Sequence, residues 1–223
     1  LERAIREPRH RGKPAIMPYI TSGFPSMEGY IELLEATGRV ADAIEVGVPF
    51  SDPMADGPTI QRSSRLALEA GVTLPWILES VKSADIQAPM ALMSYLNPLL
   101  QYGMERLMQD VVDAGISGFI IPDLPFEEGA RWRSAAEDVG LGIIQLVTPV
   151  TSPKRLQMLC EASRGFVYAV TVTGITGAKE LPEGLMDYLK TVGECSQAPV
   201  CAGFGIRSAA DIDRLVGHCD GAV

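Results

Sequence analysis

The chain has 223 residues, of which 47% are hydrophobic and 21% are charged, a composition typical of a globular protein with a sizeable core. It has no run of about 18 apolar residues and no apolar segment in its charged N-terminal stretch, so we expect neither a membrane span nor a signal peptide. The net charge of −9 argues against a nucleic acid as the main partner, because a phosphate backbone requires a basic protein face.

One pattern recurs along the chain: a short apolar run, a loop with Gly, Pro or Asp, and a helical segment with charges on one face. We expect strands at 15–21, 42–47, 89–94, 118–123, 141–147, 165–171, 198–203 and 219–223. We expect helices at 27–37, 60–71, 104–115, 126–140, 152–163, 181–194 and 208–218, and one more near 75–84. Ser152 and Ser208 stand where helix N-caps would be.

Eight strands in strict alternation with helices predict an α/β protein with a (β/α)8 or TIM barrel, formed as a single domain over residues 1–223. A doubly wound open sheet is the alternative, but the first strand leads into TSGFPS and not into the GxGxxG motif of a dinucleotide-binding sheet. The chain stops at Val223 just as the last strand begins, so we expect that strand and its closing helix to be truncated.

The second expected strand carries a carboxylate among apolar residues. Side chains alternate along a strand, so Ile44, Val46 and Val48 are expected to face the helices, while Glu45 faces the lumen between two small residues. Its place near the carboxyl end of the strand is where such barrels have their active sites. Burial there would raise its pKa and permit proton exchange near neutral pH, although a structural Glu paired in the core remains the alternative.

The loop that follows, PFSDPMADGPTIQ, contains two more carboxylates. It is either a simple turn shaped by Asp hydrogen bonds or a mobile loop that brings Asp56 over the mouth of the barrel. Asp52 is expected to shape the loop.

Two glycine-rich segments, VTVTGITGAK at 170–179 and AGFGIRS at 202–208, follow the sixth and seventh strands. Glycine lets backbone N–H groups approach a phosphate, so these loops favour a phosphate-bearing substrate. The rest of the sequence offers few other candidate catalytic or metal-binding residues. The two histidines lie far from the motif loops, which makes Ser-His-Asp chemistry improbable, and Asp123 is expected to anchor a loop. The four cysteines form no CxxC motif, which favours reduced thiols in a cytoplasmic protein over a metal site.

Several long motifs carry a family resemblance. IEVGVPFSDPMADGPTIQ resembles the signature segment of the tryptophan synthase alpha subunit, and PYITSGFP, MSYLNPLLQYG, GFIIPDLPFEE, YAVTVTGITGA and GFGIRS match in order. The resemblance covers nearly the whole chain. It implies a (β/α)8 barrel that cleaves indole-3-glycerol phosphate to indole and glyceraldehyde 3-phosphate in a retro-aldol reaction.

The resemblance also implies site residues and partners. It assigns catalytic roles to Glu45 and Asp56, places Tyr168 at the indole site, and assigns substrate binding to Thr176, Gly177 and Gly205. It implies no metal and no cofactor in this chain. A pyridoxal-phosphate-dependent beta subunit would receive the indole within an alpha2beta2 heterotetramer.

Three other functions stay open on the sequence. A stand-alone indole-3-glycerol phosphate lyase could use the same residues. A non-catalytic subunit that activates a beta partner would not need Glu45 and Asp56, and their presence argues against it. A different phosphate-binding barrel enzyme is disfavoured by the SDPMADGP loop.

Overall fold

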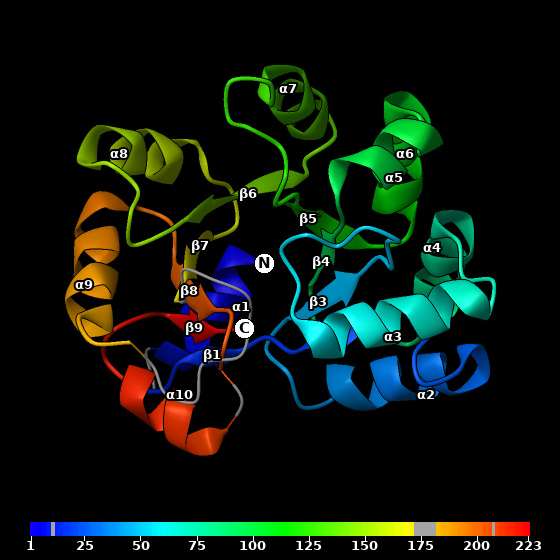
Figure 1. Cartoon of the computed structure of the whole chain (residues 1–223), viewed down its shortest axis with the longest axis horizontal. Coiled ribbons are helices and arrows are strands. Elements are labelled where there is room, and N and C mark those ends of the chain that lie inside the picture. The colour runs from blue at the N-terminus through cyan, green and yellow to red at the C-terminus, as the bar shows by residue number, and fades with distance from the viewer. Residues whose placement is uncertain (10–11, 172–181, 207) are drawn as a thin grey trace.

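The computed structural model describes residues 1–9, 12–171, 182–206 and 208–223. These residues form an α/β fold in which all strand pairs are parallel and helices surround the sheet (Figure 1). The described strands are β1 (Ala15–Ile16), β2 (Tyr19–Thr21), β3 (Ile44–Gly47), β4 (Met90–Met93), β5 (Ile116–Ile120), β6 (Gly142–Val147), β7 (Val167–Val170), β8 (Val200–Gly203) and β9 (Gly221–Ala222).

The sheet closes into a barrel through its first strand. The strand order is β1-β9-β8-β7-β6-β5-β4-β3-β2, and β1 and β2 are two parts of one continuous segment that is interrupted only at Met17 and Pro18. On one side the Met17 N–H donates to the Ala222 carbonyl at 2.9 Å, and on the other the Glu45 N–H donates to the Pro18 carbonyl at 3.0 Å. The eight predicted strands are therefore confirmed, each somewhat shorter than expected, and the open-sheet alternative is wrong.

The described residues form ten helices, all but the first of which lie outside the ring of strands. They are α1 (Glu2–Arg9), α2 (Met27–Gly38), α3 (Pro58–Glu69), α4 (Leu74–Ser83), α5 (Leu96–Tyr102), α6 (Met104–Asp113), α7 (Ala130–Asp138), α8 (Pro153–Ala162), α9 (Leu185–Cys195) and α10 (Ala209–Leu215). All eight helices expected from the sequence are present, including the extra one at α4. None of the helices in the described ranges is long and apolar enough to cross a membrane.

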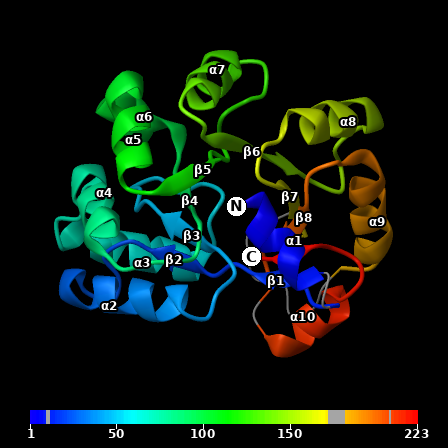
Figure 2. The same cartoon turned by 180° about the vertical axis from the view of Figure 1, so that it is seen from behind.

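Two helices, α1 and α5, do not appear in the sequence-based prediction. The sequence of α1 is mostly charged and shows little apolar pattern. Among its described side chains only Ile5 is fully buried, and it packs in the lumen near Ala15, Met17 and Phe166. Seen from behind, α1 lies across this end of the barrel (Figure 2). The first N–H of α5, from Leu96, is bound by the Asp123 carboxylate of a different loop at 2.8 Å, so that helix start depends on a tertiary contact.

Side-chain alternation divides the core as the sequence predicts. Ile44, Val46 and Val48 pack outward in the layer between strands and helices. The lumen is filled by a separate set of inward-facing residues, among them Ala91 and Ile120 on neighbouring strands. This alternation is what aims Glu45 into the barrel.

Candidate active site

A cavity of about 540 Å³ opens at the carboxyl ends of the strands. Its walls come from β2, β3 and β7 and from the loops that follow β3 and β8. They include Tyr19, Glu45, Asp56, Tyr168 and Gly205. Four of the six site residues predicted from the sequence therefore lie together: Glu45, Asp56, Tyr168 and Gly205. The other two, Thr176 and Gly177, lie outside the described residues.

Glu45 is buried at the floor of this cavity, with 1% of its surface exposed. Its Oε2 atom has no hydrogen-bond partner among the described residues. Burial, with a smaller contribution from the nearby Asp56 carboxylate, raises the pKa of Glu45 from 4.5 to about 8. The raised pKa predicted from the sequence is confirmed, and the absence of a partner for Oε2 among the described residues argues against the alternative of a paired core carboxylate.

Asp56 lies in the loop between β3 and α3, and it is held by Tyr95, the N-cap residue of α5 that follows β4. The Tyr95 hydroxyl donates to Asp56 Oδ2 at 3.2 Å and accepts from the Ala55 N–H at 2.8 Å. The Phe50 ring stacks on Tyr95 with ring centroids 5.2 Å apart, which holds the phenol in place. Burial raises the pKa of Asp56, and the Tyr95 hydrogen bond opposes this shift. Asp56 thus stands over the cavity as the second predicted carboxylate.

Two tyrosines cross the lumen over glycines of the neighbouring strand. Tyr19 is paired with Glu45 in the sheet, and its ring lies over Gly47, where an added Cβ would come within 2.2 Å of the hydroxyl. Tyr168 is paired with Cys201 and lies over Gly203 in the same way, at 2.4 Å. In both cases the glycine is two residues beyond the paired residue. The space beside Glu45 that the sequence indicates is therefore filled in part by Tyr19.

The loop after β8 brings backbone to the cavity. Phe204 and Gly205 both have positive φ, 67° and 99°, and the Thr171 hydroxyl binds the Phe204 carbonyl. The following helix, α10, starts with a complete capping box in which Ser208 accepts from the Asp211 N–H and Asp211 accepts from the Ser208 N–H. The N-cap predicted at Ser208 is confirmed. Ser152 is the N-cap of α8 by position, but it makes no side-chain cap bond.

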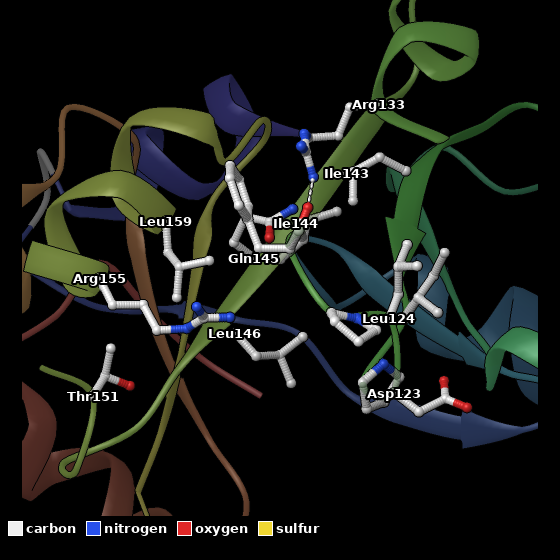
Figure 3. A pocket seen from close by; sticks show the side chains of 14 residues that line it. Asp123, Leu124, Arg133, Ile143, Ile144, Gln145, Leu146, Thr151, Arg155 and Leu159 are labelled. Atoms are coloured by element: carbon white, nitrogen blue, oxygen red, sulfur yellow. Dashed lines mark hydrogen bonds between the residues drawn. The ribbon is translucent and has the colours of Figure 1, made fainter. Parts of the chain in front are cut away.

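A second cavity, of about 290 Å³, lies between α7 and α8 (Figure 3). Arg133 reaches it from α7 and donates to the Phe126 carbonyl at 2.8 Å, while Arg155 reaches it from α8. Asp123 lines it and binds the start of α5, so its predicted role as an anchor is confirmed. This cavity contains neither of the two predicted catalytic carboxylates and is separate from the first one.

Nine of the thirteen described residues that line the first cavity were not predicted from the sequence, among them Tyr19, Thr59 and Phe204. The available signal for Tyr19 was Gly47, because a glycine inside a strand often marks a close approach by another group. Asp52 is exposed and accepts from the adjacent Ser51 hydroxyl, as expected of a loop-shaping residue.

Among the described residues no group of three or more His, Cys, Asp or Glu side chains could hold a metal ion. Fold and site together define an α/β barrel with a cavity and two carboxyl groups at the carboxyl ends of its strands, the end at which barrel enzymes have their active sites.

Comparison with known proteins identifies the kind of barrel enzyme. The family model for the tryptophan synthase alpha chain matches residues 5–223. The tryptophan synthase alpha chain of Nitratidesulfovibrio vulgaris is 45% identical over 221 residues, which cover 96% of this chain and 85% of that protein. The chain belongs to the tryptophan synthase alpha chain family, whose members are indole-3-glycerol phosphate lyases without a cofactor of their own.

Solved structures agree with this assignment. Tryptophan synthase of Mycobacterium tuberculosis superposes with a TM-score of 0.92 and 36% identity, covering 99% of this chain and 86% of that chain. The tryptophan synthase alpha2beta2 complex of Pyrococcus furiosus superposes with a TM-score of 0.88 and 32% identity, covering 94% of this chain and 86% of that chain. The predicted fold class and family are both confirmed.

Proposed function

We propose that Glu45 and Asp56 carry out the retro-aldol cleavage of indole-3-glycerol phosphate in this chain. The observation that supports this most directly is Glu45, a fully buried carboxyl group whose pKa is raised to about 8 and whose Oε2 has no partner among the described residues. At neutral pH such a group is protonated and available to a bound substrate. A buried carboxyl oxygen without a hydrogen-bond partner lowers the stability of the fold. Its position at the base of a cavity therefore favours a functional role for Glu45 over a structural one.

The chemistry needs a proton on the indole ring. Glu45 donates its proton to ring carbon C3, which converts the indole into a cationic leaving group. The bond between C3 and the side-chain carbon then breaks, and its electron pair returns to the ring. The hydroxyl on the departing carbon loses its proton to the Glu45 carboxylate and becomes the aldehyde of glyceraldehyde 3-phosphate. Indole and the aldehyde are the products, and Glu45 ends protonated as it began.

Asp56 has a different task. Its carboxylate accepts a hydrogen bond from the indole N–H and stabilises the positive charge that develops on the ring. The Tyr95 hydroxyl, at 3.2 Å from Asp56 Oδ2, favours the ionised form and fixes the direction of the carboxylate. The two carboxyl groups have different surroundings, full burial for Glu45 and a tyrosine hydrogen bond for Asp56, which suits them to different tasks. Tyr168 provides an aromatic wall for the indole ring.

We assign the phosphate group to backbone donors. None of the described residues that line the cavity is Lys or Arg. The Ser208 and Asp211 N–H groups are used within their capping box, which leaves the loop at Gly205 and Ile206 to approach the phosphate. Thr176 and Gly177 complete the proposed binding set from the loop after β7.

We also propose that the chain works in an alpha2beta2 complex, as in the solved Pyrococcus furiosus complex. In this complex it would pass indole to a pyridoxal-phosphate-dependent beta subunit. Three large apolar residues are exposed on segments that follow strand carboxyl ends: Met54 at 75%, Leu100 at 54% and Val150 at 80%. Their position around the mouth of the barrel is suited to a partner that receives a product from the cavity.

The test follows glyceraldehyde 3-phosphate release from indole-3-glycerol phosphate, with and without a beta subunit. We expect slow release alone and much faster release with the partner. Glu45→Gln should lower turnover by about 10²–10⁴-fold, the range for loss of a general acid–base group. Asp56→Asn should also lose most activity, while Asp52→Asn, in the same loop, serves as its control. Fast release without a partner would indicate a stand-alone lyase, and near-normal turnover of Glu45→Gln would refute the assigned role.

A further inference from the structure

The start of helix α3 is a structural weak point beside the active site. Its N-cap is Gly57, which makes no side-chain cap bond, and the exposed loop with Met54 precedes it. Yet this first turn belongs to the site, since Asp56, Gly57, Thr59 and Ile60 all line the cavity. Something outside the helix must therefore hold the turn in place.

A buried pair of hydroxyl groups provides that hold. Thr21 Oγ1, at the end of β2, lies 2.7 Å from Ser63 Oγ on α3, and the two residues are 4% and 6% exposed. The Ser63 hydroxyl donates to the Ile60 carbonyl at 2.9 Å. Because a hydroxyl has only one hydrogen to donate, Thr21 is the donor in its bond to Ser63. The bond thus connects the barrel strand to the first turn of α3.

The strand that carries Thr21 also lines the cavity. Tyr19, two residues before Thr21 on β2, lies over Gly47 and lines the cavity together with Glu45. The Thr21–Ser63 bond therefore ties the strand that carries Tyr19 to the helix that carries Ile60. On the helix side, the Gln61 side chain donates to the Asp56 carbonyl at 2.9 Å, which transmits the position of this turn to the carboxylate loop.

We propose that Thr21 and Ser63 are positioning residues for the cleavage reaction, because their hydrogen bond fixes the first turn of α3, and with it Asp56, against the end of β2. The inference rests on the role proposed for Asp56. Neither hydroxyl touches the reacting atoms. A carboxylate that moves by even about 1 Å loses much of its effect on the transition state, and losses on the order of 100-fold are known for such displacements.

The experiment compares variants that remove or keep the bond. Thr21→Val and Ser63→Ala each remove it, and Thr21→Ser keeps a hydroxyl at the same place. Ser64→Ala is the matched control, because Ser64 is also buried, at 2%, but lies about 100° further around α3. We expect kcat to fall by roughly tenfold in Thr21→Val and Ser63→Ala with a smaller change in KM. Thr21→Ser should restore most of the turnover, and Ser64→Ala should have little effect.

Two combined variants separate positioning from general damage. Thr21→Val with Ser63→Ala should be no slower than either single variant, since both remove one bond. In an Asp56→Asn background, Thr21→Val should cause little further loss. The inference fails if Thr21→Val and Ser63→Ala lower only the free energy of unfolding and keep kcat, or if their effects on kcat add. If Asp56→Asn itself retains turnover, the proposed role of Asp56 fails instead.

Discussion

The lumen has opposite contents at the two ends of the barrel. At the amino ends of the strands, Ile5 from α1 and Phe166 are fully buried and fill the lumen with apolar atoms. At the carboxyl ends, the lumen carries Glu45 and two tyrosines and stays open as a cavity. Apolar packing at the amino end stabilises the fold. At the carboxyl end, burial of Glu45 with no partner for its Oε2 among the described residues lowers the stability. Stability and catalysis are thus separated along the axis of the barrel.

The largest expected effect concerns the stability cost of Glu45. The native state holds a proton up to about pH 8, whereas an unfolded carboxyl loses it near 4.5. The free energy of unfolding should therefore fall as pH rises from 4.5 to 8 and level off above this window. At about 1.4 kcal/mol per pKa unit, the cost reaches several kcal/mol at most. Glu45→Gln should remove the part of the dependence that comes from Glu45, so that the variant is clearly more stable than the parent at alkaline pH and similar to it in acid.

Urea unfolding across this pH range measures the effect. The exposed Glu128→Gln is the control and should follow the parent protein. Equal stability of Glu45→Gln and the parent at alkaline pH would mean that Glu45 is not held protonated in the native state.

A substitution at the amino end of the barrel should change the free energy of unfolding and leave kcat unchanged. Ile5→Ala would leave a cavity where α1 closes the lumen, and burial of a large aliphatic side chain makes this cost about 2–5 kcal/mol of unfolding free energy. The kcat for cleavage should stay unchanged under conditions where the variant is folded, because Ile5 lies at the far end from Glu45. A fall in kcat without a fall in stability would contradict the separation of the two ends.

A substitution of Gly203 tests how closely the side chains at the carboxyl end of the barrel are packed. In Gly203→Ala the new Cβ would come within 2.4 Å of the Tyr168 hydroxyl, so the tyrosine ring must shift. We expect a loss of about 1–3 kcal/mol in unfolding free energy, typical of overpacking, together with a higher KM. Gly193→Ala on α9 is the control, because its new Cβ would lie in open space. It should change neither the free energy of unfolding nor KM. An unchanged KM in Gly203→Ala would mean that Tyr168 does not contact the substrate.

The smallest effect should come from the helix caps at the site end. Ser208→Ala removes the capping box of α10 and should cost about 1 kcal/mol, within the range for N-cap serines. Ser152→Ala removes a serine at the N-cap of α8 that makes no side-chain bond, so it should cost less. Thermal unfolding of both variants gives the comparison, and equal losses would show that cap position alone matters.

Local sequence signals were sufficient for most of the fold. Alternation in DAIEVGV predicted that Ile44 and Val46 would face the helices and that Glu45 would face the lumen, because strand geometry is set locally. The same signals predicted eight strands and all helices except α1 and α5. Those two were missed because Ile5 is the only buried residue among the described side chains of α1, and because the start of α5 is bound by Asp123 from a distant loop.

The site was predictable as residue types but not as an arrangement. The sequence by itself predicted that Glu45 lies near a strand end, that Asp56 and two glycine-rich segments follow strand ends, and that the carboxyl ends of the strands form the active-site end of a barrel. Only the tertiary structure decided that Tyr19 and Tyr168 lie over glycines of neighbouring strands, that Tyr95 binds Asp56, and that Thr21 joins Ser63. These contacts join residues up to 42 positions apart in the sequence. They depend on how the strands are registered in the closed barrel, and no local sequence pattern encodes that register.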